Sequence, residues 1–283
     1  MRYGVNIFIW SADYNPSVAE LFPAIKAGGF DGVEVPIFRP ADFQSAHLRK
    51  ALEANDLGAT AVTVLVEGLN VISPDADIRK RSIADFADKI KAIADAGIQT
   101  LAGPMYSPVG YLPGRRRTTD EWNWAVEAFQ AVTPVLDATG VSLAIEPLNR
   151  FETYFLNTVA DGVALCDAIA HPKVGMLVDT FHANIEEKDI ATAYRMAARH
   201  LKHVHTCEND RGIPGSGHIE WPSIVEAIHS TGYDGWLTIE SFGFALGEIS
   251  AAASIWRDIE KSPETIAYEG VQFLRKAFAR GTA

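Results

Sequence analysis

Cysteine is scarce in this sequence. Among its 283 residues there are two, Cys166 and Cys207, and they stand in unrelated contexts. Two such residues give no disulfide framework, and the chain contains no CxxC motif for metal or redox chemistry. Because free thiols persist in a reducing compartment, we expect a cytoplasmic protein.

Positive charge and long apolar runs are also missing. Lys and Arg number 25 against 36 Asp and Glu, which gives a formal net charge of -11 and opposes general nucleic-acid binding. No apolar stretch approaches the ~20 residues of a membrane span. The apolar run in the N-terminal segment MRYGVNIFIWSADYN is too short for the core of a signal peptide. We therefore expect no nucleic-acid partner and no membrane insertion.

Short apolar runs alternate with segments of helical spacing from one end of the chain to the other. Alternation of this kind predicts βαβ units and a parallel sheet. The eight predicted strands are Tyr3–Trp10, Gly32–Phe38, Ala59–Leu65, Thr100–Tyr106, Ser142–Leu148, Val174–Thr180, His203–Cys207 and Trp236–Ser241. The predicted helices are Val18–Ala27, Phe43–Asn55, Ile78–Ala96, Asp120–Ala138, Val159–Ile169, Ile190–His200 and Pro222–Ser230, followed by the longer stretch Ile249–Arg280.

Glycine marks the junctions between these predicted elements. Gly28–Gly29, Gly97, Gly140 and Gly232 follow predicted helices, where glycine supplies the left-handed C-cap without steric cost. The chain has no GxGxxG motif after the first strand, no linker and no shift in composition. Eight strand–helix repeats without that motif favour a closed barrel over a doubly wound open sheet. We predict an α/β fold, a (β/α)8 TIM barrel, as one domain over residues 1–283.

One carboxylate or imidazole interrupts each of the last four predicted strands near its end. Glu146, Asp179, His205 and Glu240 hold these positions, and the C-terminal strand ends carry the site in such a barrel. Each residue alone could be a buried polar group satisfied by hydrogen bonds. Three carboxylates in one pocket would repel each other unless a cation neutralises them. Together the four predict a divalent metal, Mn²⁺ foremost with Co²⁺ or Mg²⁺ as alternatives, rather than a structural zinc.

Four segments carry a resemblance to a known family. IEPLNRFE, VDTFHANIEE, HVHTCENDRGIPGSGHIEW and LTIESF resemble the sugar-epimerase branch of the xylose isomerase-like barrels, and in particular the D-tagatose/D-psicose/L-ribulose 3-epimerase family. The resemblance covers most of the chain and is most specific in the second half. It implies a metal-dependent ketose 3-epimerase acting on free ketohexoses or ketopentoses through an enediolate. It also implies a homo-oligomer, dimer or tetramer, with the C-terminal stretch as one possible contact surface.

The resemblance gives roles to the four residues. The metal would bind the carbonyl and adjacent hydroxyl oxygens of the sugar and so acidify the proton on C3. Glu146 and Glu240 would each be a metal ligand and also an acid/base, one on each face of the sugar. Inversion of C3 requires such a pair, because the proton leaves one face and returns to the other. Asp179 and His205 would be ligands alone.

Three further residues match the substrate-binding positions of that family. Glu152 would contact hydroxyls near the reacting end, and His182 would hydrogen-bond the carbonyl side. Arg211 would bind the O1–O3 end and stabilise negative charge on the enediolate. From the residues alone, Glu152 and Arg211 could also form a solvated surface pair. His182 could support a metal ligand instead of touching the sugar.

Other polar residues have a structural and a functional reading. His203 could be an added ligand, but a layer position inside the barrel is favoured. The run Arg115–Arg117 could attract an anion, but a solvated loop is favoured. The Gly212–Gly217 loop could cradle a phosphate, whereas the resemblance favours a free sugar. Cys207 is expected to pack rather than to act as a nucleophile, because the sequence shows no basic partner for it.

Other functions stay open at this point. A hydroxypyruvate isomerase or an inosose dehydratase would keep the metal and change the substrate contacts. An endonuclease IV-like phosphodiesterase would need more histidines at the mouth and a basic surface, which the net charge opposes. A non-enzymatic sugar-binding module would not need two carboxylates beside one metal.

Overall fold

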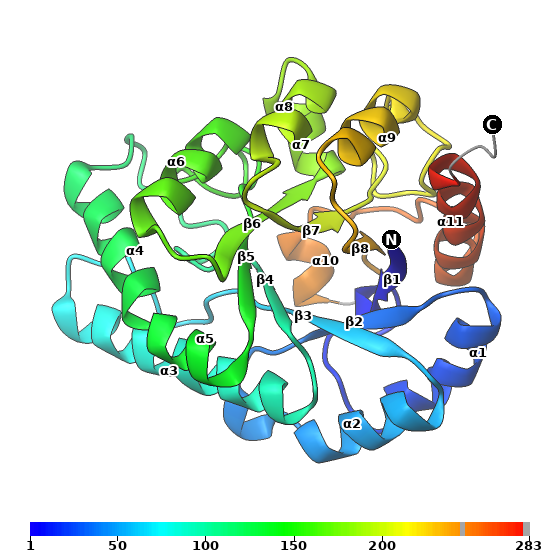
Figure 1. Ribbon diagram of the computed structural model, residues 1–283, viewed down its shortest axis with the longest axis horizontal. Coiled ribbons are helices and arrows are strands. Elements are labelled where there is room, and N and C mark those ends of the chain that lie inside the picture. The colour runs from blue at the N-terminus through cyan, green and yellow to red at the C-terminus, as the bar shows by residue number, and fades with distance from the viewer. Residues whose placement is uncertain (244–246, 280–283) are drawn as a thin grey trace.

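The computed structural model describes residues 1–243 and 247–279. Its parallel strands form a closed barrel in which each strand pairs with the next and β8 pairs with β1 (Figure 1). The predicted (β/α)8 barrel is therefore confirmed. Arg280, the last residue of the predicted C-terminal stretch, lies outside the described residues.

All eight predicted strands are present, although each of them ends earlier than predicted. The strands are β1 Arg2–Asn6, β2 Gly32–Pro36, β3 Gly58–Val62, β4 Thr100–Gly103, β5 Ser142–Ile145, β6 Val174–Asp179, β7 Leu201–His205 and β8 Trp236–Ile239. The first strand, predicted to continue to Trp10, ends at Asn6 because the Asn6 side chain accepts a hydrogen bond from Phe8 N–H. This side chain thereby caps a 3₁₀ turn, η1 (Ile7–Ile9), in place of further strand.

The helices surround the barrel, apart from α10 (Glu248–Ala252), which lies at its mouth (Figure 1). They are η2 Val18–Leu21, α1 Phe22–Ala27, η3 Pro40–Asp42, α2 Ser45–Ala54, α3 Ala76–Asp95, α4 Thr119–Ala131, α5 Thr133–Thr139, α6 Val159–Ile169, α7 Thr180–Glu186, α8 Ile190–Ala197, α9 Trp221–Ser230, α10 Glu248–Ala252 and α11 Pro263–Phe278. The helix predicted over Asp120–Ala138 is divided into α4 and α5, because Pro134 lacks the N–H that a continuous helix needs. The stretch predicted from Ile249 is likewise divided, into α10 and α11.

Helix α7 is absent from the predicted elements. It follows β6 without a loop, because the Asp179 side chain accepts a hydrogen bond from Phe181 N–H at the helix start. A residue interpreted only as a metal ligand therefore also caps a helix. One turn later α7 places His182 beside the same strand end.

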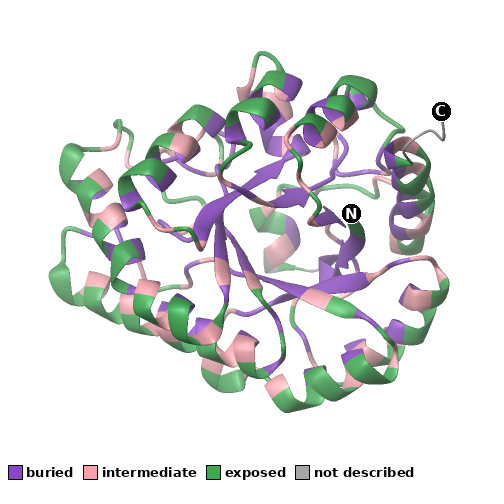
Figure 2. Ribbon diagram, viewed as in Figure 1, coloured by how far each residue is buried: buried purple, intermediate pink, exposed green. Residues whose placement is uncertain are grey.

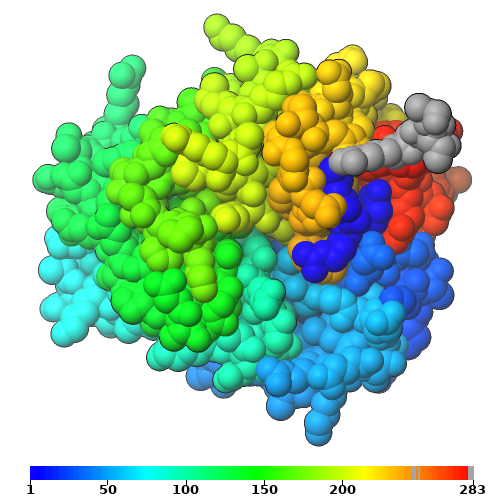
Figure 3. Space-filling view, viewed as in Figure 1, coloured from blue at the N-terminus to red at the C-terminus, as the bar shows by residue number. Residues whose placement is uncertain are grey.

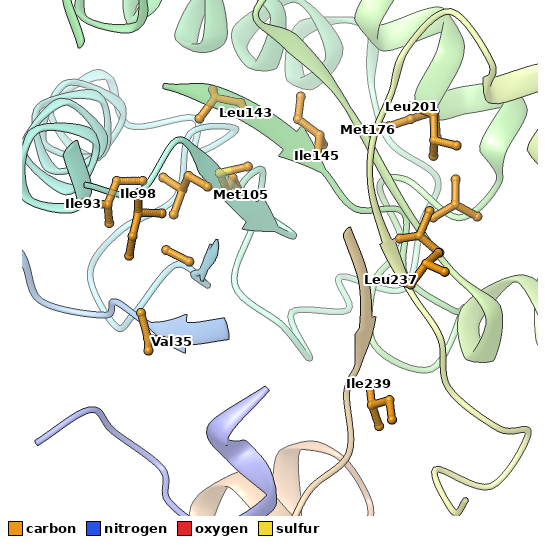
Figure 4. Packing of buried hydrophobic residues seen from close by; sticks show 14 of the residues in the cluster. Val35, Ile93, Ile98, Met105, Leu143, Ile145, Met176, Leu201, Leu237 and Ile239 are labelled. Carbon is orange, nitrogen blue, oxygen red and sulfur yellow. The ribbon is translucent and has the colours of Figure 1, made fainter. Parts of the chain in front are cut away.

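The main apolar core lies between the strands and the outer helices. Figure 2 shows the strands buried and the helices exposed on their outer faces. Val33 and Val35 of β2 point into this core. Figure 4 shows two of its contacts, Met176 beside Leu201 on the paired strands β6 and β7, and Ile93 of α3 near Ile98. Apolar burial of this kind is the main favourable term in folding.

The inside of the barrel is largely polar on one side. Alternation along β2 turns Glu34 inward, opposite in direction to Val33 and Val35. Glu34 is paired in register with Asn6 of β1 and Thr60 of β3, and all three are buried. Barrel interiors are more often filled with branched apolar side chains. This interior therefore depends on hydrogen bonds, since a buried polar group without a partner is destabilising.

Helix α11 is part of the outer ring. Its apolar residues, among them Val271 and Leu274, are buried, and the helix contacts β1 and β8. This apolar face is therefore already covered within the chain, and the contact surface expected of the C-terminal stretch stays a prediction. In the space-filling view the gaps between the ribbons are filled by atoms, and the N-terminus lies beside the residues that precede β8 (Figure 3). There the Met1 ammonium pairs with Asp234 at 2.5 Å.

Among the described helices, none combines the length and apolar character of a bilayer span.

Candidate metal centre and active site

The four residues predicted as metal ligands meet at one side of the barrel mouth. Asp179 and His205 are the last residues of β6 and β7, while Glu146 and Glu240 directly follow β5 and β8. One ligand atom from each lies within 4.8 Å of the others, and all four residues are buried. Because consecutive parallel strands end at the same rim, the chain positions all four donors without any long loop.

Two buried atoms of this group lack hydrogen-bond partners. They are Oε1 of Glu146 and Nδ1 of His205, which lie 3.9 Å apart. Buried polar atoms in proteins are almost always hydrogen-bonded or bound to a metal. Three carboxylates and one imidazole are the donor set of a hard divalent cation. The residues present therefore fit the metal that the sequence predicts.

Burial and neighbouring charges set the two glutamates apart. Burial, together with the charge of Glu240, raises the pKa of Glu146 well above its usual value. Burial also acts to raise the pKa of Glu240, but the adjacent His205 and Arg211 outweigh it, so that the pKa of this glutamate is lowered. The two carboxyl groups therefore lie in different electrostatic surroundings.

Arg211 lies among the carboxylates and not on the surface. Its Nη1 donates to Asp179 Oδ2 at 2.7 Å and lies 3.0 Å from Glu240 Oε2. Only 4% of the residue is exposed. The alternative of a solvated surface pair with Glu152 is therefore wrong for Arg211. Glu152 is half-buried and accepts a hydrogen bond from Asn149 Nδ2 at 2.8 Å. Together with Arg211 it lines the cavity at the barrel mouth.

The backbone of Arg211 adopts an unusual conformation. Its φ of 66° lies in the left-handed region, which is costly for a residue other than glycine. Ser241 Oγ donates to the Arg211 carbonyl at 2.6 Å and helps to hold this conformation. The guanidinium carbon lies 4.1 Å from the ring centroid of Phe181 and 5.3 Å from that of Phe242. Strain of this kind, held by surrounding contacts, is typical of functional sites.

Glu208 organises the loop that carries Arg211, and the sequence interpretation did not single it out. The residue is completely buried, and its carboxylate accepts hydrogen bonds from Gly215 N–H, Ile219 N–H and the Trp221 indole at 2.7, 3.1 and 2.9 Å. Two backbone amides in and after the glycine-rich loop are therefore directed at Glu208. The phosphate cradle considered for this loop has no support from these contacts.

His182 presents an N–H to the site. Both the Asn149 N–H at 3.2 Å and the Asn149 Nδ2 at 3.0 Å face its Nδ1, which assigns the ring proton to Nε2. The contact of Nε2 with Arg211 Nη2 at 3.3 Å is then no hydrogen bond, because both groups would donate. Nε2 lies 3.7 Å from Glu146 Oε1 and 3.7 Å from Asp179 Oδ2. Burial and the charge of Arg211 lower the pKa of His182 well below its usual value, which keeps the ring neutral. The histidine can therefore donate one hydrogen bond to a ligand beside the carboxylates.

The cavity in front of these residues joins an ionisable region to an apolar one. Its ionisable lining residues are Glu146, Glu152, His182, Arg211 and Glu240, and its apolar ones include Phe8, Phe38, Leu148 and Phe242. Phe8 stacks on Phe242 and on Phe38 with centroid distances of 5.5 and 6.1 Å. Among the described residues that line the cavity, Arg211 is the one permanent cation. The cavity suits a small ligand that is polar at one end.

The arginine run after β4 joins its loop to helices α4 and α6. Arg115 makes two hydrogen bonds to Glu121 at 3.0 and 2.6 Å, and Arg117 pairs with Asp161 at 2.8 Å. The Arg117 guanidinium also donates to the Phe155 carbonyl at 2.7 Å. The run lies in a loop with Arg115 and Arg116 exposed, as favoured from the sequence, and two of its members are also ion-pair partners. No residue of the run lines the cavity.

Cys207 and His203 both lie inside the fold, as their structural readings predicted. Cys207 is buried, and burial raises the pKa of its thiol well above the usual value. Its Sγ lies 2.8 Å from Arg211 Nη1, so the thiol has a basic neighbour that the sequence did not reveal. His203 is completely buried, and its Nε2 lies 2.7 Å from Glu34 Oε2 in the barrel interior.

Glu34 is the second buried carboxylate that the sequence interpretation missed. It lies 2.7 Å from His205 as well as from His203. A signal for it exists in the sequence, because it is the single charged residue in the apolar run GVEVPIF. A carboxylate in a fully buried strand needs partners of its own. Those partners come from strands far away in the sequence, so local spacing could not name them.

Comparisons with known proteins agree with this geometry. The model of the xylose isomerase-like TIM barrel family matches residues 22–277. A probable ketose 3-epimerase of Synechocystis sp. is 38% identical over 98% of this chain and 97% of its own length. An L-ribulose 3-epimerase of Mesorhizobium japonicum is 32% identical over 91% of this chain and 88% of its own. The crystal structure of a D-allulose 3-epimerase from Methylomonas sp. with D-allulose superimposes with a TM-score of 0.92 at 26% identity, covering 98% of this chain and 97% of that one.

Proposed function

Because this chain belongs to the xylose isomerase-like TIM barrel family, in which it is similar to ketose 3-epimerases, we propose that it is a metal-dependent ketose 3-epimerase. The substrate would be an unphosphorylated ketohexose or ketopentose, inverted at C3. The observation that carries the proposal is the placement of Glu146 and Glu240. These buried carboxylates follow β5 and β8, and His205 Nδ1 lies 3.9 and 3.4 Å from their respective oxygens.

The two glutamates would move the proton. One carboxylate removes the hydrogen from C3, and the electron pair of the broken C–H bond enters the adjacent carbonyl to give an enediolate. The other carboxyl group then delivers a proton to the opposite face of C3, which inverts the centre and restores the carbonyl. A divalent cation held by Glu146, Asp179, His205 and Glu240 would polarise the carbonyl and so acidify the C3 hydrogen.

Three other residues would bind the sugar beside the reacting carbon. His182 would donate from Nε2 to an oxygen on the carbonyl side, because its N–H faces the cavity. Arg211 would bind the O1–O3 end and stabilise the negative charge of the enediolate. Glu152 would accept hydrogen bonds from nearby hydroxyl groups, since it lines the same cavity.

The lining of the cavity supports a free sugar in preference to a sugar phosphate. A phosphate group is usually held by several cations or by a set of free backbone amides. The described lining offers one permanent cation, Arg211, which already lies 2.7 and 3.0 Å from two carboxylates. The amides of Gly215 and Ile219 donate to Glu208 and are not free.

The remaining parts of the proposal follow the sequence. We propose Mn²⁺ as the metal, with Co²⁺ and Mg²⁺ as alternatives, since oxygen-rich sites accept all three. The protein would be a cytoplasmic homo-oligomer, a dimer or tetramer, and the whole chain, residues 1–283, would form one barrel domain. Light scattering after size-exclusion chromatography measures the number of subunits.

Proton NMR in D₂O tests the reaction directly. Mn²⁺-loaded protein is incubated with D-tagatose, D-psicose, D-fructose or L-ribulose, and the metal is removed before each spectrum. We expect deuterium at C3 and the appearance of the C3 epimer, with the fastest sugar defining the substrate class. An aldose product would indicate a hydroxypyruvate isomerase type of reaction, and loss of water would indicate a dehydratase. No exchange at C3 with any ketose, despite bound metal, would contradict the proposal.

A further inference from the structure

Glu34 occupies the barrel interior next to the candidate metal centre. Its Oε1 accepts a hydrogen bond from Asn6 Nδ2 at 3.0 Å and lies 2.7 Å from Nε2 of His205. Its Oε2 accepts a hydrogen bond from Thr60 Oγ1 at 2.8 Å and lies 2.7 Å from Nε2 of His203. One carboxylate thus joins β1, β2 and β3 to β7, and β7 is not a neighbour of β2 in the barrel.

We propose that Glu34 is a positioning residue for His205, an inference that rests on the metal dependence proposed above. An ionised carboxylate can only accept, so its contact at 2.7 Å fixes the imidazole proton on Nε2. The lone pair is then left on Nδ1, which lies beside Glu146 and Glu240. Nδ1 is buried without a hydrogen-bond partner, as expected of a nitrogen that is directed at a cation.

Glu34 is itself held by groups with fixed orientations. The Asn6 amide is oriented because its Oδ1 accepts a hydrogen bond from Phe8 N–H at 2.9 Å, which turns Nδ2 toward Glu34. Thr60 lies on the strand paired with β2, directly opposite Glu34 in the register. Both donors are anchored to strands of the barrel wall, so the carboxylate has little freedom to move. The orientation of His205 is thereby determined by the barrel and not by a loop.

A second cation between Glu34, His203 and His205 is the competing explanation, because their ligand atoms also lie within 4.8 Å of one another. The donors around the carboxylate oppose it. Oε1 accepts from Asn6 and is hydrogen-bonded to His205, and Oε2 accepts from Thr60, while His203 Nε2 lies 2.7 Å from Oε2 without forming a hydrogen bond. The 2.7 Å between His205 Nε2 and Glu34 Oε1 is also the length of a charge-assisted hydrogen bond.

Metal affinity tests the inference without reference to turnover. Mn²⁺ is titrated by calorimetry into chelator-treated wild type and Glu34→Gln, which keeps the shape of the side chain and removes its charge. We expect roughly 10–100-fold weaker binding, the usual effect of losing such a partner of a metal-binding histidine. The matched control Glu121→Gln removes the charge of another buried, hydrogen-bonded carboxylate that does not line the cavity, and should bind as wild type. Wild-type affinity in Glu34→Gln would overturn the inference.

The tautomer of His205 gives a second measurement that needs no variant and therefore does not depend on how Glu34→Gln folds. Long-range ¹⁵N–¹H NMR of histidine-labelled, Mg²⁺-loaded protein should place the proton of His205 on Nε2, whereas a proton on Nδ1 would overturn the inference. The two proposals can fail separately. Weaker Mn²⁺ binding in Glu34→Gln without any C3 exchange in wild type would support this inference and contradict the epimerase. C3 epimerisation by wild type, together with unchanged Mn²⁺ affinity in Glu34→Gln, would contradict this inference and support the epimerase.

Discussion

Oε1 of Glu146 and Nδ1 of His205 lie 3.9 Å apart at the barrel mouth, and both atoms are buried without a hydrogen-bond partner. They belong to different strand ends, and Asp179 and Glu240 complete the group around them. Such atoms are destabilising unless something binds them, because burial removes the water that would otherwise solvate them. A cation bound at the candidate metal centre should therefore stabilise the folded protein.

Binding of Mn²⁺ should raise the melting temperature of the chelator-treated protein. A cation that binds only the folded state, at about 100 times its dissociation constant, adds about 2.7 kcal/mol. In a chain of this size that corresponds to roughly 5–10 °C. Differential scanning fluorimetry with and without Mn²⁺ measures the shift. Asp179→Asn removes one charged ligand, and an undiminished shift in this variant would contradict the assigned ligand set.

Replacement of either catalytic candidate by glutamine should stop turnover. Glu146→Gln and Glu240→Gln keep an oxygen for the metal but cannot carry the proton, so kcat should fall roughly 10²–10⁴-fold or more. The measurement is the rate of C3 exchange by NMR, with metal content determined on each sample so that lost binding is not mistaken for lost chemistry. Near-wild-type kcat in one metal-loaded variant would show that the reaction needs only one carboxylate.

Arg211→Met should impair both binding and catalysis. The guanidinium is the one permanent cation in the described lining, and removal of a charge-stabilising donor typically lowers kcat about 10²–10³-fold. KM should rise as well, because the O1–O3 end of the sugar loses a partner. Arg115→Met is the matched control, since Arg115 pairs with Glu121 and does not line the cavity. Equal kinetic losses in the two variants would mean that Arg211 acts through stability alone.

Glu121 should stabilise the fold near neutral pH and lose this contribution in acid. Burial acts to raise its pKa, but hydrogen bonds from Arg115, Thr118 N–H and Tyr154 OH outweigh burial and lower the pKa to about 2. Since the unfolded value is about 4.3, the contribution is complete above that pH and is lost as the pH falls from there toward about 2.

Urea unfolding at several pH values checks this contribution. The gap in stability between wild type and Glu121→Gln should be largest near neutral pH and should shrink below about pH 4.3. Glu127→Gln, at an exposed position of the same helix α4, is the control and should show little difference at any pH. A gap that stays constant down to pH 3 would contradict the assigned pKa.

Local elements could be predicted because their causes lie within a few residues. Helix α6 has the predicted bounds, Val159–Ile169, since Thr158 caps its start and Ala170 adopts a left-handed φ of 56° at its end. The wrongly predicted end of the first strand also has a local cause, but the apolar run around it is the more conspicuous pattern. The strand predicted through Trp10 ends early because Asn6 caps a turn, and the apolar residues that continue the run do not reveal this.

The sequence by itself determined the barrel class and the four residues at the ends of consecutive strands. Both follow from the order of apolar runs, polar residues and glycines along the chain, which translates into position through the regular geometry of βα units. The roles of Glu152, His182 and Arg211 came from resemblance and stay predictions, although all three line the cavity.

Tertiary structure alone decided which side chains touch. Glu34 and His205 are 171 residues apart, and they meet because closure of the barrel brings β2 and β7 across from each other. Burial of Arg211 against Asp179 depends in the same way on a strained loop that Glu208 and Ser241 hold in place. Periodicity along one strand says which way a side chain points, but distances between strands depend on register and closure, which belong to the whole fold.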